Sequence, residues 1–361
     1  FTVIYIERKS MIPSFSGRRL IKAVAVLALL PLIITQTACT SSSKKDEIQP
    51  VEQEGYYLDT VCKISVYDMK GGLKEKKAKA AIDKGYDRCR ELDKELSNTV
   101  DASDISRINN SGGQWTQVGD DALTVIKGGI KYGDLSNGAF DITIGTVADL
   151  WDYHAEHPKP PEQSKIDEAL THVNYKNIQI NGNYVRLLDP KAKIDLGGIA
   201  KGYIADQVAD TLQEAGVTSA VINLGGNIVT IGSKPDGSDF VIGIEKPYSD
   251  RSEVIGKTQI SSGTVVTSGV YERQFKYKGK VYHHILSSTT GYPVDTDLDS
   301  VTLMSTRGMS MDIDALSTIC LIYGTEKGKA LINSLDDTEA VFCKSNGKIV
   351  KTKDARFQAE K

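Results

Sequence analysis

The segment KIDLGGIAKGYIADQVADTLQEAGVTSAVINLGGNIVTIG, residues 193–232, decides the fold. KIDLGG is typical of a strand that runs into a glycine turn. The next stretch, 199–216, predicts a helix that ends at Gly216. SAVINLGGNIVTIG, 219–232, predicts two strands joined by a second glycine turn. A helix is therefore expected beside a sheet whose neighbouring strands are antiparallel.

The rest of the chain repeats this mixture of helices and hairpins. Turn signals at Asn181-Gly182 and Lys278-Gly279 predict two further hairpins. The remaining elements that we expect are strands at 60–68 and 299–305, helices at 74–97, 120–138 and 311–324, and a loop that opens a short helix at 102–110. This order predicts an α+β fold, a single domain over residues 55–361 with largely antiparallel sheets and packed helices.

The first residues have the pattern of an export signal. Met11 is the expected initiator, and a basic start is followed by the short apolar run 23–34. That run ends at Cys39, within Thr-Ala-Cys-Thr, as in a bacterial lipoprotein site, although Gln36 stands where leucine is usual. We expect residues 1–39 to be upstream sequence and signal, and 40–54 a flexible tether. Lipidation at Cys39 would anchor the protein outside the cytoplasm, and the alternative is plain secretion.

Composition excludes some classes of function. The net charge of -3 provides no basic field for nucleic acid. The other cysteines (Cys62, Cys89, Cys320 and Cys343) have no CxxC spacing, so a zinc site is not expected. Cys89 and Cys320 fall in apolar helical patterns, and we predict no essential disulfide.

Phosphate chemistry is indicated at the first glycine turn. Gly197 and Gly198 would let the backbone approach a ligand, and free N–H groups at a helix start attract phosphate. Lys201 could neutralise a phosphate oxygen. A tight turn with a solvated lysine explains the same residues. The pattern is not GxGxxG, so no dinucleotide-binding Rossmann unit is predicted.

Three other groups of residues suggest a site, each with an ordinary alternative. Asp314 and Thr318 share one helix face and form a hard oxygen pair suited to Mg²⁺, or a merely exposed face. His283 and His284 point to opposite sides of a strand, so at most one faces a given site. Phe140 and Trp151 could flank a flat ring or lie in the core.

Taken together, these segments resemble the ApbE family of FAD:protein FMN transferases. The matching segments are LS at 96–97 with SDISRIN at 103–109, GAFDITIG at 138–145, DLGGIAKGY at 195–203, LGGNI at 224–228, TSGVYER at 267–273, HIL with TGYPV at 284–294, and SVTLMS with DALST at 300–318. The departures are Thr146 for proline, Leu58-Asp59-Thr60 for Met-Gly-Thr, and Ser287-Ser288 for Asp-Pro.

The resemblance implies a site for FAD with Mg²⁺ at its pyrophosphate. The metal ligands would be Asp314, Thr318 and the carbonyl of Ala200, and Lys201 would contact phosphate. The residues that would line the FAD site are Asp141, Gly197, Gly198, Ser268 and Gly269. His284 would be the catalytic base. This assignment requires the glycine turn and the helix face at 314–318 to meet in space.

The implied reaction moves FMN from FAD onto a threonine or serine hydroxyl of an acceptor protein and releases AMP. The acceptor would be an exported or membrane redox protein. Family targets resemble D-x-x-[ST]-x-[AS]-T, and this chain has no convincing copy, so it is not expected to modify itself. The alternatives are an FAD pyrophosphatase, a flavin-binding lipoprotein without catalysis, and a generic solute-binding lipoprotein.

Overall fold

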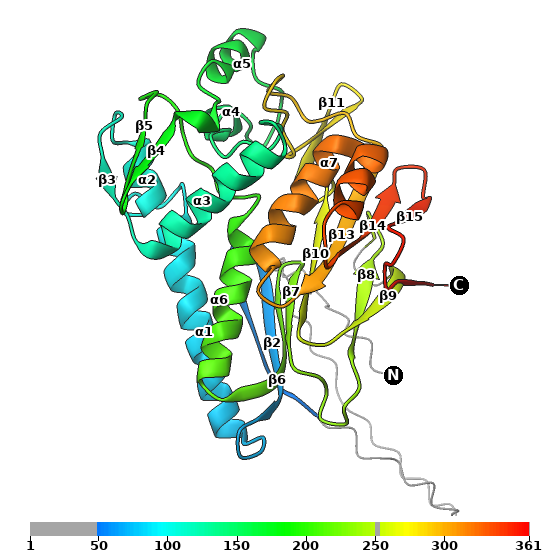
Figure 1. Cartoon of the computed structure of the whole chain (residues 1–361). Coiled ribbons are helices and arrows are strands. Elements are labelled where there is room, and N and C mark those ends of the chain that lie inside the picture. Colours follow the sequence, from blue (N-terminus) through cyan, green and yellow to red (C-terminus); the bar gives the residue numbers. More distant parts are fainter. Residues whose placement is uncertain (1–48, 250–252, 361) are drawn as a thin grey trace, which may run out of the picture.

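The computed structural model describes residues 49–249 and 253–360. The predicted signal and Cys39 lie outside these residues. In the described chain eight strands form one antiparallel sheet in the order β1-β2-β6-β7-β10-β13-β14-β15 (Figure 1). Its strands are β1 (Val51–Tyr57), β2 (Thr60–Met69), β6 (Val217–Leu224), β7 (Asn227–Ile231), β10 (Gly263–Gly269), β13 (Leu298–Thr306), β14 (Thr338–Lys344) and β15 (Ile349–Lys351). The predicted α+β class is confirmed.

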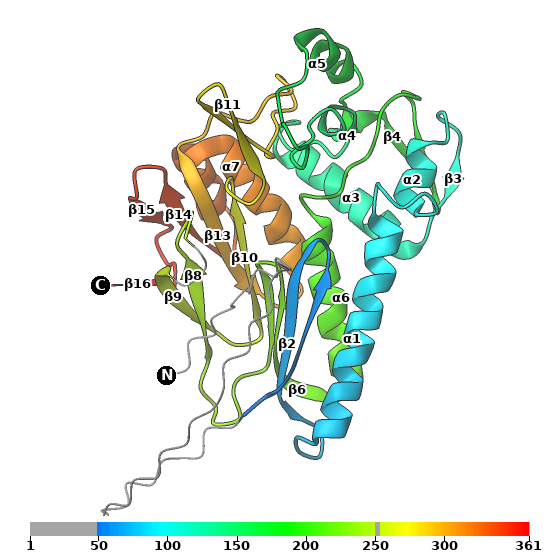
Figure 2. The ribbon, with the colours of Figure 1, turned by 180° about the vertical axis from the view of Figure 1, so that it is seen from behind.

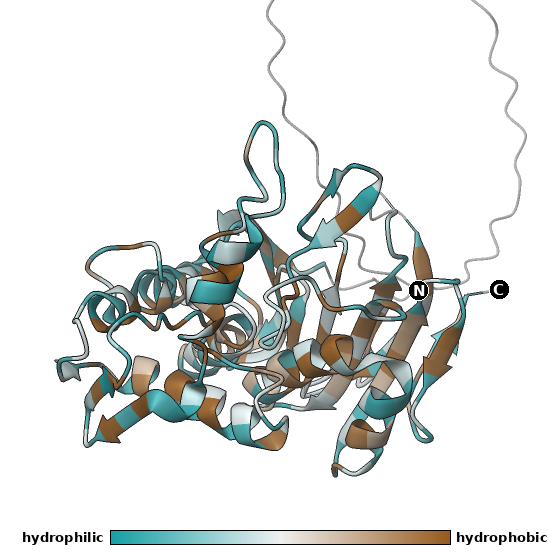
Figure 3. Cartoon of the chain, turned by 90° about the horizontal axis from the view of Figure 1, so that it is seen from above, coloured by the Kyte–Doolittle hydropathy of each residue, from teal (hydrophilic) through white to brown (hydrophobic). Residues whose placement is uncertain are grey.

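Both faces of this sheet are covered. Helices α1 (Glu75–Leu96), α6 (Ala200–Glu214) and α7 (Ser310–Asn333) lie on one face, and β8 (Phe240–Glu245), β9 (Val254–Ile260) and β16 (Gln358–Ala359) form a small sheet over the other (Figure 2). Side chains of β6 alternate accordingly, since Ile222 packs with the helices and Val221 with β8. Figure 3 shows apolar residues recurring along the helices and strands, and the buried ones pack in one cluster on each face of the sheet.

Helix α6 is held on the sheet by one apolar face. Ile204, Val208 and Leu212 follow one another at intervals of one helical turn and are fully buried. Each contributes about 2 kcal/mol of apolar burial. This packing places the first residues of α6 beside α7, which lies next to it in both ribbon views.

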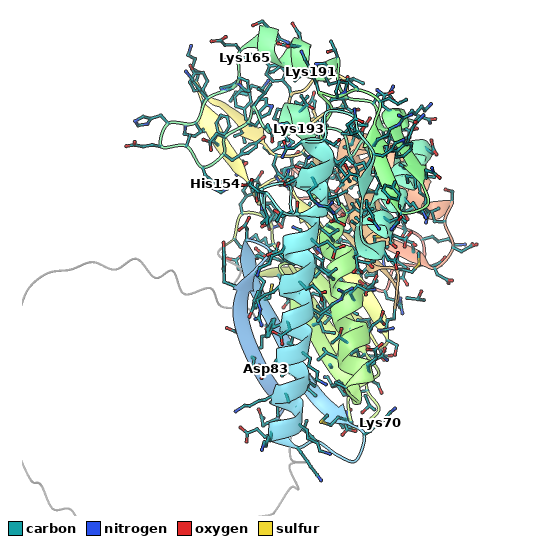
Figure 4. The ribbon with its side chains drawn as sticks, turned by 90° about the vertical axis from the view of Figure 1, so that its left-hand side faces the viewer. Lys70, Asp83, His154, Lys165, Lys191 and Lys193 are labelled. Atoms are coloured by element: carbon teal, nitrogen blue, oxygen red, sulfur yellow. The ribbon has the colours of Figure 1, made fainter. Side chains whose placement is uncertain are left out.

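Smaller elements form a second region beyond the ends of α6 and α7. They are α2 (Asp104–Asn109), β3 (Thr116–Gln117), α3 (Asp120–Leu135), α4 (Gly145–Ala148), α5 (Gln163–Leu170), η1 (Tyr175–Asn177), β4 (Ile178–Asn181), β5 (Tyr184–Leu187), β11 (Gln274–Tyr277) and β12 (Lys280–His283). The β11–β12 hairpin packs with α4 and α5 around Trp151, whose ring lies 6.2 Å from that of Phe275. Trp151 is therefore a core aromatic residue. Lys193, labelled in Figure 4, pairs with Asp149 at 2.5 Å and holds this region to the first glycine turn.

Two local predictions were wrong. KIDLGG is not a strand, because Lys193 forms only an isolated bridge to Ile144. Residues 51–54, expected in the tether, belong to β1 and pair with β2. Both hairpins are confirmed.

The cysteines and the long helices agree with the sequence. Cys62, Cys89, Cys320 and Cys343 are free and buried, as the apolar pattern around Cys89 and Cys320 indicated. Helix α7 continues past its predicted end through a kink at Gly324, where φ is 72°. Among the described residues, no helix has the length and apolar character needed to cross a bilayer.

Candidate active site

The glycine turn that begins at Asp195 is held by side chains from an early part of the chain. Asn109 accepts the N–H of Ile194 at 2.7 Å and donates to its carbonyl at 2.9 Å. The Asp195 carboxylate accepts the N–H of Gly197 at 2.7 Å and the side-chain amide of Asn98 at 3.0 Å. The turn is thus fixed directly before the first N–H groups of α6, the position where helices bind phosphate.

This turn and the acidic face of α7 meet. The N–H of Gly202 donates to Asp314 Oδ2 at 2.9 Å. A Cβ atom at Gly202 would lie 2.2 Å from the carbonyl oxygen of Ser310, so only glycine fits here. One at Gly198 would lie 3.3 Å from Thr318 Oγ1. The contact on which the predicted site depends is confirmed.

The carboxyl group of Asp314 is almost removed from water. Its exposed fraction is 3%. Burial raises the pKa of this carboxyl, whereas Lys201 and hydrogen bonds from Gly202 and Asn227 lower it. A buried carboxylate needs such compensation, and a bound cation would add more.

The oxygen atoms around Asp314 fit a hard cation. Among the described residues, the Thr318 hydroxyl has one hydrogen-bond acceptor, the carbonyl of Asp314 at 3.5 Å. Asn227 is 2% exposed, and its Oδ1 has no hydrogen-bond partner among the described residues. Ala200, whose carbonyl is the third expected ligand, is the first residue of α6 and stands two residues before Gly202, which bonds to Asp314. These donors suit Mg²⁺, which prefers oxygen ligands and keeps several waters.

The ligand set would contain a single carboxylate. Within residues 49–249 and 253–360, no group of three or more His, Cys, Asp or Glu side chains could hold a metal ion. Phosphate oxygens and water would therefore have to complete the coordination shell.

The two adjacent histidines have different surroundings, and at most one was expected to face a given site. His283 is buried; its Nε2 lies 3.2 Å from the carbonyl of Val294, and its Nδ1 accepts the N–H of Ile285 at 3.3 Å. His284 Nδ1 lies 3.2 Å from the carbonyl of Arg273, so Nδ1–H is the donor and Nε2 keeps its lone pair. Burial, helped by the charges of Arg273 and Lys201, lowers the pKa of His284 to about 3. The ring is neutral at physiological pH and can accept a proton.

Arg273 and Asn227 were missed as site residues by the sequence reasoning. Arg273 affects the pKa of both Asp195 and His284, and so joins Lys201 in a positively charged group around the turn. Asn227 orients Asp314. Both stand inside quoted motifs, TSGVYER and LGGNI, but nothing in their spacing indicates that they face the turn and the helix.

Both oxygen atoms of the Asp141 carboxylate accept hydrogen bonds from the protein itself. One oxygen accepts the N–H and hydroxyl of Thr143 at 2.8 and 2.6 Å, and the other accepts the N–H of Tyr175 at 2.9 Å. The neighbouring Phe140 ring lies 3.0 Å from where a Cβ of Gly198 would stand. Asp141 thus fixes the segment that carries Phe140 against the turn.

Ser268 and Gly269 lie at the end of β10, beside α7. The Ser268 hydroxyl is 2.6 Å from that of Ser317, which also donates to the carbonyl of Asp314 at 2.7 Å. A Cβ atom at Gly269 would come within 2.6 Å of the Tyr271 ring. The end of β10 is therefore hydrogen-bonded to Ser317, the residue before Thr318.

Ser287 stands where the resembled family has aspartate. Its hydroxyl accepts the N–H groups of Thr289 and Thr290, both at 3.2 Å. An aspartate side chain makes the same kind of local turn, so the serine preserves the loop that follows His284.

The fold and the site define an α+β protein in which the first turn of α6 meets a buried carboxylate of α7. The chain belongs to the ApbE family, whose family model matches residues 58–342. It is 38% identical over 224 residues to the FAD:protein FMN transferase of Klebsiella pneumoniae, covering 62% of this chain and 68% of that protein. It is 29% identical over 329 residues to the FAD:protein FMN transferase of Treponema pallidum, covering 84% and 90%.

Solved structures show the same likeness. The ApbE protein from Thermotoga maritima superposes with a TM-score of 0.76 at 29% identity, covering 84% of this chain and 97% of that one. The flavin transferase ApbE from Vibrio cholerae gives a TM-score of 0.73 at 27% identity, covering 84% and 97%.

Proposed function

We propose that this protein transfers FMN from FAD to a threonine or serine hydroxyl of an acceptor protein. The observation that carries the proposal is the contact between Gly202 and Asp314. It brings the first turn of α6, where phosphate would bind, to the carboxylate that would hold a hard cation. The relatives named FAD:protein FMN transferase support it. The generic solute-binding alternative leaves this contact unexplained.

The reaction balances as a phosphoryl substitution. The acceptor oxygen forms a bond to the FMN-side phosphorus of FAD, the bond from that phosphorus to the bridging oxygen breaks, and AMP leaves. His284 Nε2 takes the hydroxyl proton. The α6 N-terminus and Lys201 hold the pyrophosphate. Mg²⁺, when held by Asp314, Thr318 and the Ala200 carbonyl, would supply charge neutralisation at the phosphates.

One assay tests this function against its rivals. The purified domain is mixed with FAD, Mg²⁺ and an acceptor protein bearing the family's target motif, and the products are denatured. We expect flavin fluorescence that stays with the acceptor, together with AMP. Free FMN and AMP without labelled protein would indicate an FAD pyrophosphatase, and unchanged FAD would indicate a binding protein. Either of these two results would overturn the proposal.

We also propose that the protein acts outside the cytoplasm, anchored by lipid on Cys39, with an exported or membrane redox protein as acceptor. The motif around Cys39 supports the anchor. A Cys39→Ala variant should move from the membrane fraction to the soluble extracytoplasmic fraction. If that variant stayed with the membranes, lipidation at Cys39 would not be the anchor.

A further inference from the structure

Helices α6 and α7 cap each other. On one side, the N–H of Gly202 in the first turn of α6 donates to the Asp314 carboxylate of α7 at 2.9 Å. On the other side, the N–H groups of Ser310 and Met311 in the first turn of α7 donate to Asp206 Oδ2 of α6, at 2.9 and 3.3 Å. Gly202 and Asp206 are one turn apart in α6, and Ser310 and Asp314 are one turn apart in α7. The two contacts between the helices are therefore also separated by one helical turn.

The first turn of α7 is capped by a side chain of another helix, Asp206 of α6. Its own N-cap residue, Met309, offers no side-chain hydrogen bond. Orphan N–H groups at a helix start need an acceptor, and a carboxylate also favours the positive end of the helix. Within the described chain the other oxygen, Asp206 Oδ1, has no hydrogen-bond partner. Within the described chain, the hydrogen bonds of this carboxylate therefore all come from α7.

The contribution of this cap to stability depends on pH. Asp206 is 9% exposed. Burial raises its pKa to about 6, Asp210 acts in the same direction, and the two N–H groups and Arg307 oppose them. The pKa of Asp206 is 3.8 in the unfolded chain and about 6 in the folded protein. Between these two pH values the folded protein therefore binds a proton that the unfolded chain has released. Stability from this group therefore falls as the pH rises through about 6.

We propose that Asp206 is a positioning residue for the active site. By fixing the first turn of α7 on α6, it sets where Asp314 and Thr318 stand relative to the glycine turn. Asp314 lies one turn after Ser310, so movement of the capped turn would displace the carboxylate directly. The inference rests on the proposed function for its choice of FAD as the probe.

The test compares Asp206→Ala with Asp206→Asn and a control, Asp210→Ala. Asn keeps an oxygen acceptor for the α7 amides, whereas Ala removes it. Asp210 is on the same helix, with a side chain 52% exposed and an ion pair to Arg307. FAD binding is measured by flavin fluorescence in Mg²⁺ and in EDTA at 20 °C, and melting temperatures are measured alongside.

We expect Asp206→Ala to weaken FAD binding in Mg²⁺ by about tenfold or more, which corresponds to losing one charge-assisted interaction. The loss in EDTA should be smaller, because Asp314 acts chiefly through the cation. Asp206→Asn and Asp210→Ala should bind FAD almost as the wild type does. If Asp206→Ala does not fold, Asp206→Glu replaces it, since the longer side chain keeps the charge but displaces the capped turn.

The outcomes separate the two proposals. A folded Ala or Glu variant that melts at a lower temperature but binds FAD with wild-type Mg²⁺ dependence would show that Asp206 is only structural. A wild-type protein without Mg²⁺-dependent FAD binding would instead contradict the proposed function.

Discussion

Asp314→Asn is expected to slow FMN transfer by about 10²–10³-fold, the cost typical of removing one electrostatic stabiliser of a transition state. Asn is the same size and keeps an oxygen that can accept the Gly202 N–H, so the helix contact survives. What disappears is the negative charge that faces Lys201 and would hold the cation. The measurement is the initial rate of covalent flavin labelling as a function of Mg²⁺ concentration, and the variant should need far more Mg²⁺.

Asp312→Asn provides a matched control on the same helix. Its carboxylate pairs with Lys131 at 2.6 Å and accepts a hydrogen bond from Tyr132, both on α3. This variant should transfer FMN at close to the wild-type rate. An Asp314→Asn protein with unchanged Mg²⁺ dependence would remove Asp314 from the metal site.

The fold could be predicted where the chain's own pattern settles it. The helix expected over 199–216 is α6, Ala200–Glu214, because its apolar residues and its glycine end are local signals. Residues 51–54 were missed because β1 lies at the edge of the sheet, where polar residues are tolerated and Val-Glu-Gln-Glu looks like a tether. KIDLGG was wrongly predicted to be a strand. The N–H of Ile194 is bonded by the side chain of Asn109, where a strand would have the backbone of a neighbouring strand.

The site could be predicted only in part, because its residues lie far apart along the chain and no local pattern connects them. The meeting of the glycine turn with the face at 314–318 was expected through the family resemblance, since no periodicity connects residues so far apart. Asp206 stands inside a helix with an ordinary pattern, and its partners Ser310 and Met311 lie on another element. Contacts of this kind follow from how two helices cross, which only the three-dimensional structure shows.

His284→Ala is expected to reduce the rate of transfer by about 10²–10⁴-fold, the usual contribution of a general base. FAD binding should change little, because the proposed role concerns the acceptor proton and the phosphates are held by other groups. The rate of labelling and the dissociation constant for FAD are measured on the same preparation. His154→Ala, an exposed histidine labelled in Figure 4, is the control and should behave as the wild type does.

The pH dependence gives this prediction a second and independent test. Burial lowers the pKa of His284 to about 3 from its ordinary 6.5, so between these values the unfolded chain binds a proton that the folded chain does not. Stability must therefore fall as the pH falls through this window, and His284→Ala should remove that part of the fall. For the same reason the base stays neutral in mild acid, and its titration should not depress kcat/KM near pH 6.5. A His284→Ala protein that transfers FMN at the wild-type rate would show that another group takes the proton.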